Sequence, residues 1–179
     1  RFMAILVGIG TAVADDPLLN CRIEGRGVRQ PIRVVVDSNA RLSLESQLVQ
    51  TAEEYRTIVA YTRFAPEERV KALREAGVEM LLCEEKEGVD VRNLLELLGQ
   101  FGIDSILLEG GGSLNYTFLA EGLADELYAF VAPKIVGGMN AKTPVEGTGV
   151  EKMADAINLE LKNVLNIGDD VLLKLKVKN

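Results

Sequence analysis

The sequence of 179 residues contains no histidine, no tryptophan and only two cysteines, Cys21 and Cys83. Without histidine, catalytic arrangements that pair a serine or cysteine with an imidazole are excluded, and so are metal sites built on histidine. Two cysteines are too few for a structural zinc site, and they lie far apart in the sequence. We therefore expect no bound metal and two reduced thiols in a reducing compartment.

Basic residues are also scarce, because 20 lysines and arginines stand against 27 acidic residues, giving a net charge of −7. This balance disfavours nucleic acids and anionic membrane surfaces as partners. No apolar run approaches the roughly 20 residues of a membrane span, and the apolar start at residues 2–7 is too short for a signal peptide. We expect a cytoplasmic protein that binds neither nucleic acid nor membranes.

Short apolar runs alternate with helical patterns along the chain, without repeats or linkers. The runs that predict strands cover residues 4–8, 32–37, 57–61, 78–82, 103–109 and 126–132. Helices are predicted over 66–76, 90–101 and 113–121, and the alternation of apolar residues from Leu159 to Val177 predicts an antiparallel hairpin. The pattern indicates one α/β domain over residues 1–179, with a largely parallel sheet covered by helices on both faces. In such sheets, ligands bind beyond the carboxyl ends of the strands.

The glycines after the strand at 103–109 are the strongest candidate for a binding site. Gly110, Gly111 and Gly112 precede a helix that starts near Ser113. Glycines let a ligand approach the backbone closely, and a helix start offers free N–H groups to a phosphate. Ser113 suits an N-cap or a phosphate donor. The alternatives are a tight turn without a ligand and, for Glu109, a solvated carboxylate rather than a ligand anchor.

A second candidate follows the first strand, where Gly8 and Gly10 form a Gly-x-Gly pattern. The third glycine of the dinucleotide fingerprint is absent, so the motif is weak. Thr11 and Asp15 lie where they can reach a ligand, although a helix cap and a turn residue are equally compatible with the sequence.

The segment from Asp37 to Arg41 follows the second strand, where dinucleotide-binding proteins select between NAD and NADP. Ser38 and Arg41 suit a 2′-phosphate and thus NADP, whereas Asp37 favours NAD if its carboxylate points into the site. The alternative is an Asx-type turn.

Two further segments are ambiguous. Arg22, Arg26, Arg29 and Arg33 form a basic cluster that suits either a phosphate or a solvated loop. The segment 132–138 either lines the site or only redirects the chain.

Taken in order, these segments resemble the reductase domain of the bifunctional deaminase/reductase of riboflavin biosynthesis. The matching stretches are Ile5–Thr11, Ala14–Arg22, Pro31–Ser38, Leu108–Ser113, Leu123–Leu127 and Ala132–Gly138. Any one stretch is weak, but the ordered set is specific and covers essentially the whole chain.

The resemblance implies a dihydrofolate-reductase-like fold and a homodimer. It implies NADPH-dependent reduction of 5-amino-6-(5-phosphoribosylamino)uracil to 5-amino-6-(5-phosphoribitylamino)uracil. It places cofactor contacts on Thr11, Asp15, Ser38, Gly111, Gly112, Ser113, Leu114, Asn115, Tyr116 and Thr117, and substrate contacts on Leu19, Arg22 and Glu109. The 2′-phosphate argument adds Arg41 as a cofactor residue.

The sequence departs from the family in two ways. The zinc deaminase half is absent here, so we expect it elsewhere in the full-length chain. The resemblance also implies an earlier strand and helix in the reductase domain, which we expect to be missing here because residues 4–8 already read as a buried strand behind Arg1.

No proton donor or other catalytic residue can be named. The alternatives are a non-catalytic nucleotide-binding fragment and a related NADPH reductase acting on a pteridine such as dihydrofolate.

Overall fold

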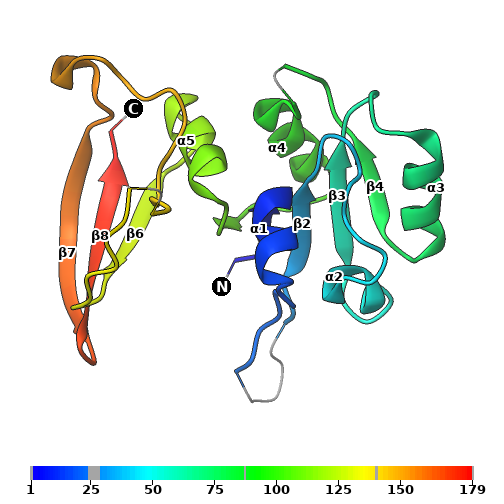
Figure 1. Cartoon of the computed structure of the whole chain (residues 1–179), viewed down its shortest axis with the longest axis horizontal. Helices are drawn as coiled ribbons and strands as arrows, with labels where there is room; N and C mark the ends of the chain where they lie inside the picture. Colours follow the sequence, from blue (N-terminus) through cyan, green and yellow to red (C-terminus); the bar gives the residue numbers. More distant parts are fainter. Residues whose placement is uncertain (1, 24–28, 87, 140, 179) are drawn as a thin grey trace. The chain divides into compact units, whose positions relative to one another are not determined.

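The computed structural model describes residues 2–23, 29–86, 88–139 and 141–178. The chain divides into two compact units, residues 1–111 and 112–179. Figure 1 shows both units, and each is described by itself below.

The first unit is built on five parallel strands in the order β4-β3-β2-β1-β5. These strands are β1 (Ala4–Gly8), β2 (Ile32–Val36), β3 (Thr57–Tyr61), β4 (Glu79–Leu82) and β5 (Ile106–Leu108). The helices between them are α1 (Ile9–Asp15), α2 (Gln47–Gln50), α3 (Glu67–Glu75) and α4 (Val91–Gln100). The predicted α/β class with a parallel sheet is confirmed.

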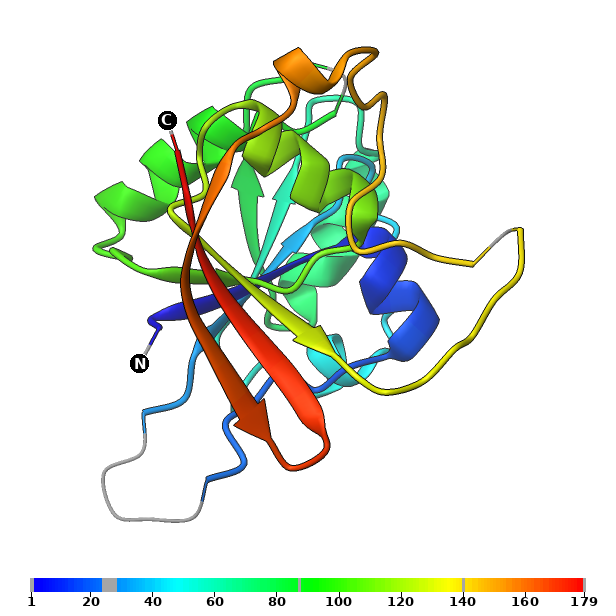
Figure 2. The same ribbon diagram turned by 90° about the vertical axis from the view of Figure 1, so that its left-hand side faces the viewer.

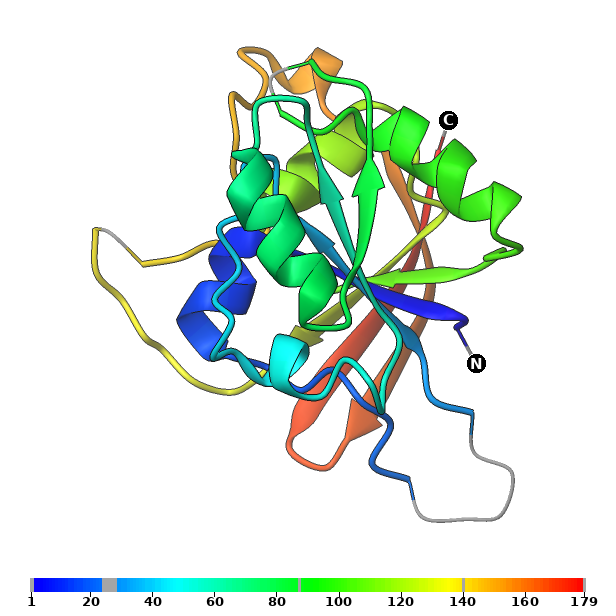
Figure 3. The same ribbon diagram turned by 90° about the vertical axis from the view of Figure 1, so that its right-hand side faces the viewer.

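Alternation along the strands gives the sheet two apolar faces. Val7, Val35 and Val59 point to one face and pack in a core cluster with side chains of α1, α2 and α3. Their neighbours in sequence point to the opposite face because successive side chains alternate. Figures 1 and 3 show α3 and α4 on opposite sides of the sheet, so helices cover both faces as predicted.

A local signal sets the start of α4. The Asp90 side chain accepts hydrogen bonds from the backbone N–H groups of Arg92 and Asn93 at 2.9 and 3.2 Å. This is an N-cap, and it satisfies donors that a helix start leaves free. Leu94 and Leu98 are fully buried one turn apart. The amphipathic pattern therefore places the apolar side of α4 on the sheet.

The strand predicted over 103–109 is shorter in the structure. Only residues 106–108 pair with β1, while the backbone N–H groups of Met3 and Ala4 donate to the carbonyl of Ser105. Glu109 therefore lies beyond the strand end.

The second unit contains α5 (Gly112–Ala120) and an antiparallel sheet in the order β6-β8-β7. The strands are β6 (Glu126–Val131), β7 (Leu159–Ile167) and β8 (Asp170–Val177), and a short 3-10 helix covers Met153–Asp155. Figure 2 shows the long, twisted ribbon of β7 and β8. The predicted C-terminal hairpin is confirmed. None of the helices in the described parts of the chain is long and apolar enough to cross a membrane.

Candidate functional site

Two predicted cofactor residues, Thr11 and Gly111, meet beside the carboxyl ends of β1 and β5. The backbone N–H of Glu109 donates to the carbonyl of Leu6 at 2.9 Å, which carries the glycine segment past the end of β1. A Cβ on Gly111 would lie 3.4 Å from the hydroxyl oxygen of Thr11. The structure thus brings a hydroxyl and a glycine backbone together across about 100 residues of sequence.

Two acidic residues flank this point. Asp15, the last residue of α1, and Glu109 both lie exposed. They are reachable from solvent, as a ligand contact requires.

The loop after β2 holds Ser38 and Arg41 but turns Asp37 inward. Asp37 is completely buried, and its Oδ2 accepts a hydrogen bond from the backbone N–H of Leu42 at 2.8 Å. Burial raises the pKa of Asp37 above its ordinary value, against the opposing effect of the Leu42 hydrogen bond. Asp37 thus closes its own loop, as the turn interpretation expected, and does not point to a ligand.

Ser38 and Arg41 differ in how they are engaged. The Ser38 hydroxyl accepts a hydrogen bond from the backbone N–H of Val89 at 3.1 Å. The Arg41 side chain is 64% exposed and lies 3.9 Å from an Asp37 oxygen. Arg41 is therefore a reachable cation whose charge is partly balanced by the carboxylate beneath it.

The predicted substrate residues Leu19 and Arg22 lie on the loop after α1. Leu19 packs against the core cluster and has a left-handed backbone conformation, with φ of 48°. Arg22 is exposed. The loop therefore presents a cationic side chain to solvent next to an anchored apolar one.

The remaining predicted cofactor residues lie on α5 in the second unit. This helix begins at Gly112, so Ser113 lies inside its first turn. Of the two roles considered for Ser113, the N-cap is wrong because the helix starts one residue earlier, and the role of phosphate donor stays a prediction. Thr117 donates a hydrogen bond to the Ser113 carbonyl at 3.1 Å, and Leu114 is half-buried.

The segment 143–149 packs over the start of α5, which no sequence signal indicated. The backbone N–H of Glu146 donates to the Gly112 carbonyl at 3.0 Å, and Asn115 donates to the Pro144 carbonyl at 2.9 Å. The Tyr116 hydroxyl donates to the Gly149 carbonyl at 2.9 Å. These bonds involve three predicted cofactor residues, Gly112, Asn115 and Tyr116, and Ser113 adds a fourth contact with this segment.

The contact needs a glycine at position 112. A Cβ there would lie 2.5 Å from the Glu146 Cγ and 2.8 Å from the Thr143 carbonyl oxygen. The Ser113 hydroxyl donates to the Glu146 carboxylate at the long distance of 3.4 Å. An anionic group thus already lies at the positive end of α5.

Arg33 is the clearest correction to the sequence interpretation. It was grouped with Arg22, Arg26 and Arg29 as a phosphate-binding or solvated cluster, but its side chain is completely buried on β2. Arg22 and Arg29 are exposed, and Arg26 lies outside the described residues.

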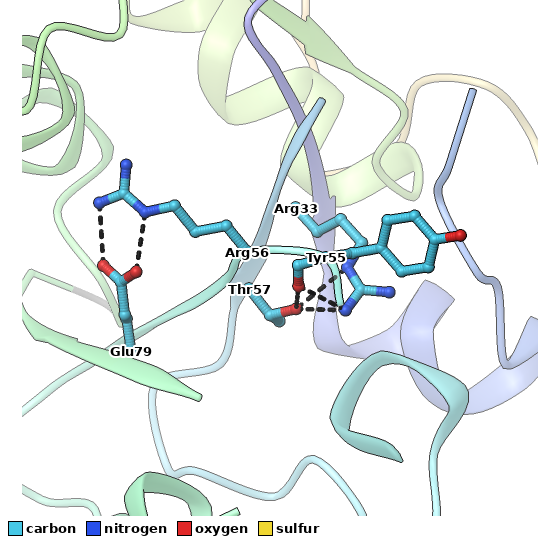
Figure 4. A network of polar contacts seen from close by, with 5 residues as sticks. All are labelled: Arg33, Tyr55, Arg56, Thr57 and Glu79. Atoms are coloured by element: carbon cyan, nitrogen blue, oxygen red, sulfur yellow. Dashed lines mark hydrogen bonds and ion pairs between the residues drawn. The ribbon is translucent and has the colours of Figure 1, made fainter. Parts of the chain in front are cut away.

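The Arg33 guanidinium is surrounded by oxygen atoms of the protein, and Figure 4 draws two of the residues that supply them, Tyr55 and Thr57. Its acceptors are the side chains of Thr51 and Thr57 and the carbonyls of Leu18, Leu48, Thr51 and Tyr55. It also lies over the Tyr55 ring, 5.2 Å from the centroid. Burial lowers the pKa of Arg33 to about 10, so it stays charged at neutral pH. The apolar strand pattern placed Arg33 in β2, but it did not indicate which residues accept hydrogen bonds from its side chain.

The other groups have simpler surroundings. Pro133 and Lys134 are exposed on the loop after β6. Burial raises the pKa of the Cys83 thiol to about 12, so this thiol stays protonated at neutral pH. Among the described residues, no three cysteine, aspartate or glutamate side chains gather as a metal site.

Taken by itself, each unit has hydroxyls, a glycine backbone and charged side chains of the kind that hold a phosphorylated ligand. Comparison with known proteins identifies the family. Residues 2–173 match the family described as the RibD C-terminal domain. The chain belongs to this family.

Relatives in the RibD C-terminal domain family are named as enzymes of riboflavin biosynthesis or as reductases. The riboflavin biosynthesis protein RibD of Actinobacillus pleuropneumoniae is 44% identical over 174 residues, which are 97% of this chain and 46% of that protein. The 2,5-diamino-6-ribosylamino-4(3H)-pyrimidinone 5′-phosphate reductase of Methanothermobacter thermautotrophicus is 43% identical over 98% of this chain and 80% of that protein. The chain thus spans about half the length of the RibD relative and most of the reductase.

The fold agrees with solved RibD structures. RibD of Acinetobacter baumannii superposes with a TM-score of 0.83 at 30% identity, over 99% of this chain and 47% of that protein. The Thermotoga maritima protein described as a diaminohydroxyphosphoribosylaminopyrimidine deaminase/5-amino-6-(5-phosphoribosylamino)uracil reductase has a TM-score of 0.76 at 26% identity. The RibD-like reductase fold predicted from the resemblance is confirmed.

Proposed function

We propose that this chain reduces 5-amino-6-(5-phosphoribosylamino)uracil to 5-amino-6-(5-phosphoribitylamino)uracil with NADPH. The observation that carries the proposal is the match of residues 2–173 to a single family whose named relatives are reductases of this pathway. The match crosses the boundary between the two units. We therefore propose that both units act as one reductase domain.

The reaction needs little acid–base catalysis by side chains of the protein. A hydride is added to the ribose C1′, the bond from C1′ to the ring oxygen breaks, and that oxygen takes up a proton. NADPH supplies the hydride when bound, while the protein supplies binding, orientation and electrostatics. A chain without histidine is compatible with this chemistry.

The residues present fit a dinucleotide phosphate. Helix α5 has nine residues, and its first N–H groups and positive dipole end favour an anion. A carboxylate, that of Glu146, already lies there beside the Ser113 hydroxyl. Thr11 and Gly111 offer a hydroxyl and a close backbone approach in the first unit. We propose that Thr11 and Gly111 in the first unit and the start of α5 in the second unit each contact the cofactor. We also propose that a cofactor phosphate displaces the Glu146 carboxylate from the start of α5.

NADPH is proposed over NADH because of Ser38 and Arg41. A guanidinium is the natural donor to a phosphate, and Arg41 is largely exposed. Its ion pair with Asp37 is long, at 3.9 Å, and most of its side chain is reachable from solvent.

Titration with NADPH and NADH, followed by nicotinamide fluorescence, tests the cofactor assignment directly, since the chain has no tryptophan. We expect NADPH to bind more tightly and Arg41→Gln to abolish most of the preference. Arg63→Gln is the matched control, because Arg63 is also exposed beside a carboxylate, 3.5 Å from Glu85. Binding of neither nucleotide contradicts the proposal. Binding without turnover favours the non-catalytic alternative.

The substrate assignment depends on Arg22. Loss of an arginine–phosphate contact of about 1.5–3 kcal/mol raises KM roughly 10- to 150-fold. We expect this for Arg22→Gln with the phosphorylated substrate and no such change for Arg29→Gln, an exposed arginine on the same stretch. An unchanged KM removes Arg22 from the site, and turnover of dihydrofolate instead identifies a pteridine reductase.

A second candidate substrate is the 2,5-diamino-6-ribosylamino-4(3H)-pyrimidinone 5′-phosphate named for the Methanothermobacter relative, of which the chain covers 80%. The two pyrimidines differ by a deamination. The uracil would come from a deaminase domain such as the one named for the Thermotoga protein. The ratio of kcat/KM for the two compounds decides between them.

We further propose a cytoplasmic homodimer. The free thiols Cys21 and Cys83 fit a reducing compartment. One face of the antiparallel sheet is aliphatic, and Val131, Leu161 and Val164 on it are more than half exposed. A second copy of the chain would cover this face. Sedimentation velocity is expected to give a dimer that Leu161→Asp dissociates, and a monomer for the parent chain contradicts it.

A further inference from the structure

The first part of the loop between α1 and β2, residues 16–22, makes hydrogen bonds at three separate points. The Gln47 N–H donates to the Asp16 carboxylate at 2.9 Å, and Arg33 Nη1 donates to the Leu18 carbonyl at 3.2 Å. The side-chain amide of Gln30, on the same loop, accepts from the Cys21 N–H at 2.8 Å and donates to the Cys21 carbonyl at 3.3 Å. The bonds at Asp16 and Leu18 therefore tie this part of the loop to α2 and β2.

This part of the loop needs contacts that stabilise it, because two of its residues have unfavourable backbone conformations. Asp16 and Leu19 have φ of 38° and 48°. A leucine in the left-handed region persists only where its surroundings determine the conformation. Among the hydrogen bonds that hold the loop, the one nearest to Leu19 joins Arg33 to the adjacent Leu18 carbonyl.

Burying the charged Arg33 side chain at this position costs desolvation free energy. It is completely buried, and none of its acceptors among the described residues is a carboxylate. An apolar side chain of similar volume would leave its buried oxygen acceptors without a donor. What only a guanidinium provides is a rigid fork of donors in fixed directions.

That fork connects the loop to the rigid part of the unit. Nη1 is shared between the Leu18 carbonyl and the Thr51 hydroxyl, at 3.2 and 2.8 Å. Nε donates to the Thr57 hydroxyl at 3.0 Å, at the start of β3 (Figure 4). Because Arg33 belongs to β2, its Nη1 by itself ties the Leu18 carbonyl to the sheet, whichever other acceptors the guanidinium has.

We propose that Arg33 is a positioning residue for substrate: it fixes the loop so that Leu19 and Arg22 meet the phosphorylated pyrimidine in one geometry. The inference rests on the proposed function, which assigns these two residues to the substrate. Arg33 itself touches no substrate, because it has no exposed surface. Its loss should change substrate binding and leave cofactor binding alone.

The test compares Arg33→Lys with Thr57→Val in the 179-residue chain. Lysine keeps the charge but cannot hold all the acceptors, so the Leu18 bond is lost or weakened. Thr57→Val removes two bonds to Arg33 away from the loop and leaves the Leu18 contact. KM, kcat, NADPH affinity, Tm and amide hydrogen exchange of residues 16–23 are measured for both.

We expect Arg33→Lys to raise the substrate KM about 10-fold, equivalent to about 1.4 kcal/mol, with NADPH affinity within about twofold of the parent chain. Exchange of the 16–23 amides should accelerate in this variant. Thr57→Val should lower Tm with KM and loop exchange close to those of the parent. A raised KM in Arg33→Lys, together with a lowered Tm but unchanged KM in Thr57→Val, distinguishes positioning from a merely structural role.

Two results would overturn the inference. One is an Arg33→Lys variant with lower Tm but unchanged KM and loop exchange. The other is a Thr57→Val variant that raises KM as much as Arg33→Lys. If the parent chain has no reductase activity, the proposed function fails separately, and the exchange data still decide whether Arg33 fixes the loop.

Discussion

Both sheets contain many apolar residues, but they are buried very differently. In the parallel sheet, Val34, Val35, Ile58 and Val59 have no exposed surface, whereas every residue of β7 in the antiparallel sheet is exposed. Parallel strands need cover on both faces, and an antiparallel sheet does not. Apolar strand content therefore indicates a strand, but it does not indicate what covers it.

The largest expected effect contrasts one leucine from each unit. Leu48 on α2 is completely buried, and Leu161 on β7 is 56% exposed. Leu48→Ala should lower the free energy of unfolding by about 2–5 kcal/mol. Leu161→Ala should lower it by about 0.5 kcal/mol or less at concentrations where the chain is monomeric.

Urea unfolding of both leucine variants measures these differences. An equal and concentration-independent loss in the two variants would mean that Leu161 is covered within the chain, and the contrast between the sheets would disappear.

Gly111 and Gly112, the adjacent glycines at the boundary of the units, allow a second comparison between an open and a closely packed position. Gly112→Ala places a Cβ 2.5 Å from the Glu146 Cγ, so the packed segment 143–149 must shift. Overpacking of this kind costs about 1–3 kcal/mol. Gly111→Ala meets Thr11 at 3.4 Å and should leave stability nearly unchanged.

Thermal unfolding and NADPH titration of both glycine variants give the result. If NADPH passes close to the backbone at 111, Gly111→Ala weakens binding without lowering Tm. A stable Gly112→Ala variant would contradict the close packing of Glu146.

The buried carboxyl of the first unit gives a pH-dependent prediction. Burial raises the pKa of Asp37, so the folded state binds its proton more tightly than the unfolded chain. The ionised carboxyl therefore costs stability at neutral pH, and this cost disappears as pH falls through the folded pKa. The parent chain should gain stability relative to Asp37→Asn as pH is lowered from about 7 to about 4.

Urea unfolding of the Asp37 pair at several pH values follows this gain. A difference that is independent of pH would show that Asp37 is not desolvated, and a gain with rising pH would show that Arg41 dominates its environment.

The smallest effect is expected for the exposed ion pair of Arg56 and Glu79 (Figure 4), with contacts of 2.7 and 2.9 Å. Arg56 lowers the pKa of Glu79, so the stabilisation is present at neutral pH and is lost as pH falls through that pKa. Both side chains are more than 40% exposed. Solvent screening therefore limits the effect of Arg56→Met to about 0.2–1 kcal/mol.

The Arg56 prediction is checked by chemical denaturation at neutral and acidic pH. A loss at neutral pH as large as that of Leu48→Ala would overturn the distinction between buried and exposed contacts.

Much of the fold followed from local patterns. The apolar runs at 57–61 and 32–37 became β3 and β2, and Asp90 capped α4 where the helix was predicted to start. The four-residue α2 was not predicted, since it has too few residues for a helical period. Of the candidate site, the proximity of Gly111 and Thr11 could be predicted, because both follow strands whose carboxyl ends lie side by side in a parallel sheet.

By itself, the sequence determined the α/β class, the order of the strands along the chain, the absence of histidine chemistry and the resemblance that led to the family. These depend on residue type and short-range spacing. Only the tertiary structure decided that Arg33 is buried beneath the loop 16–22, that Asp37 turns inward and that Glu146 lies over the start of α5. Each of these depends on contacts between residues distant in sequence, which a charge or a glycine in the sequence does not specify.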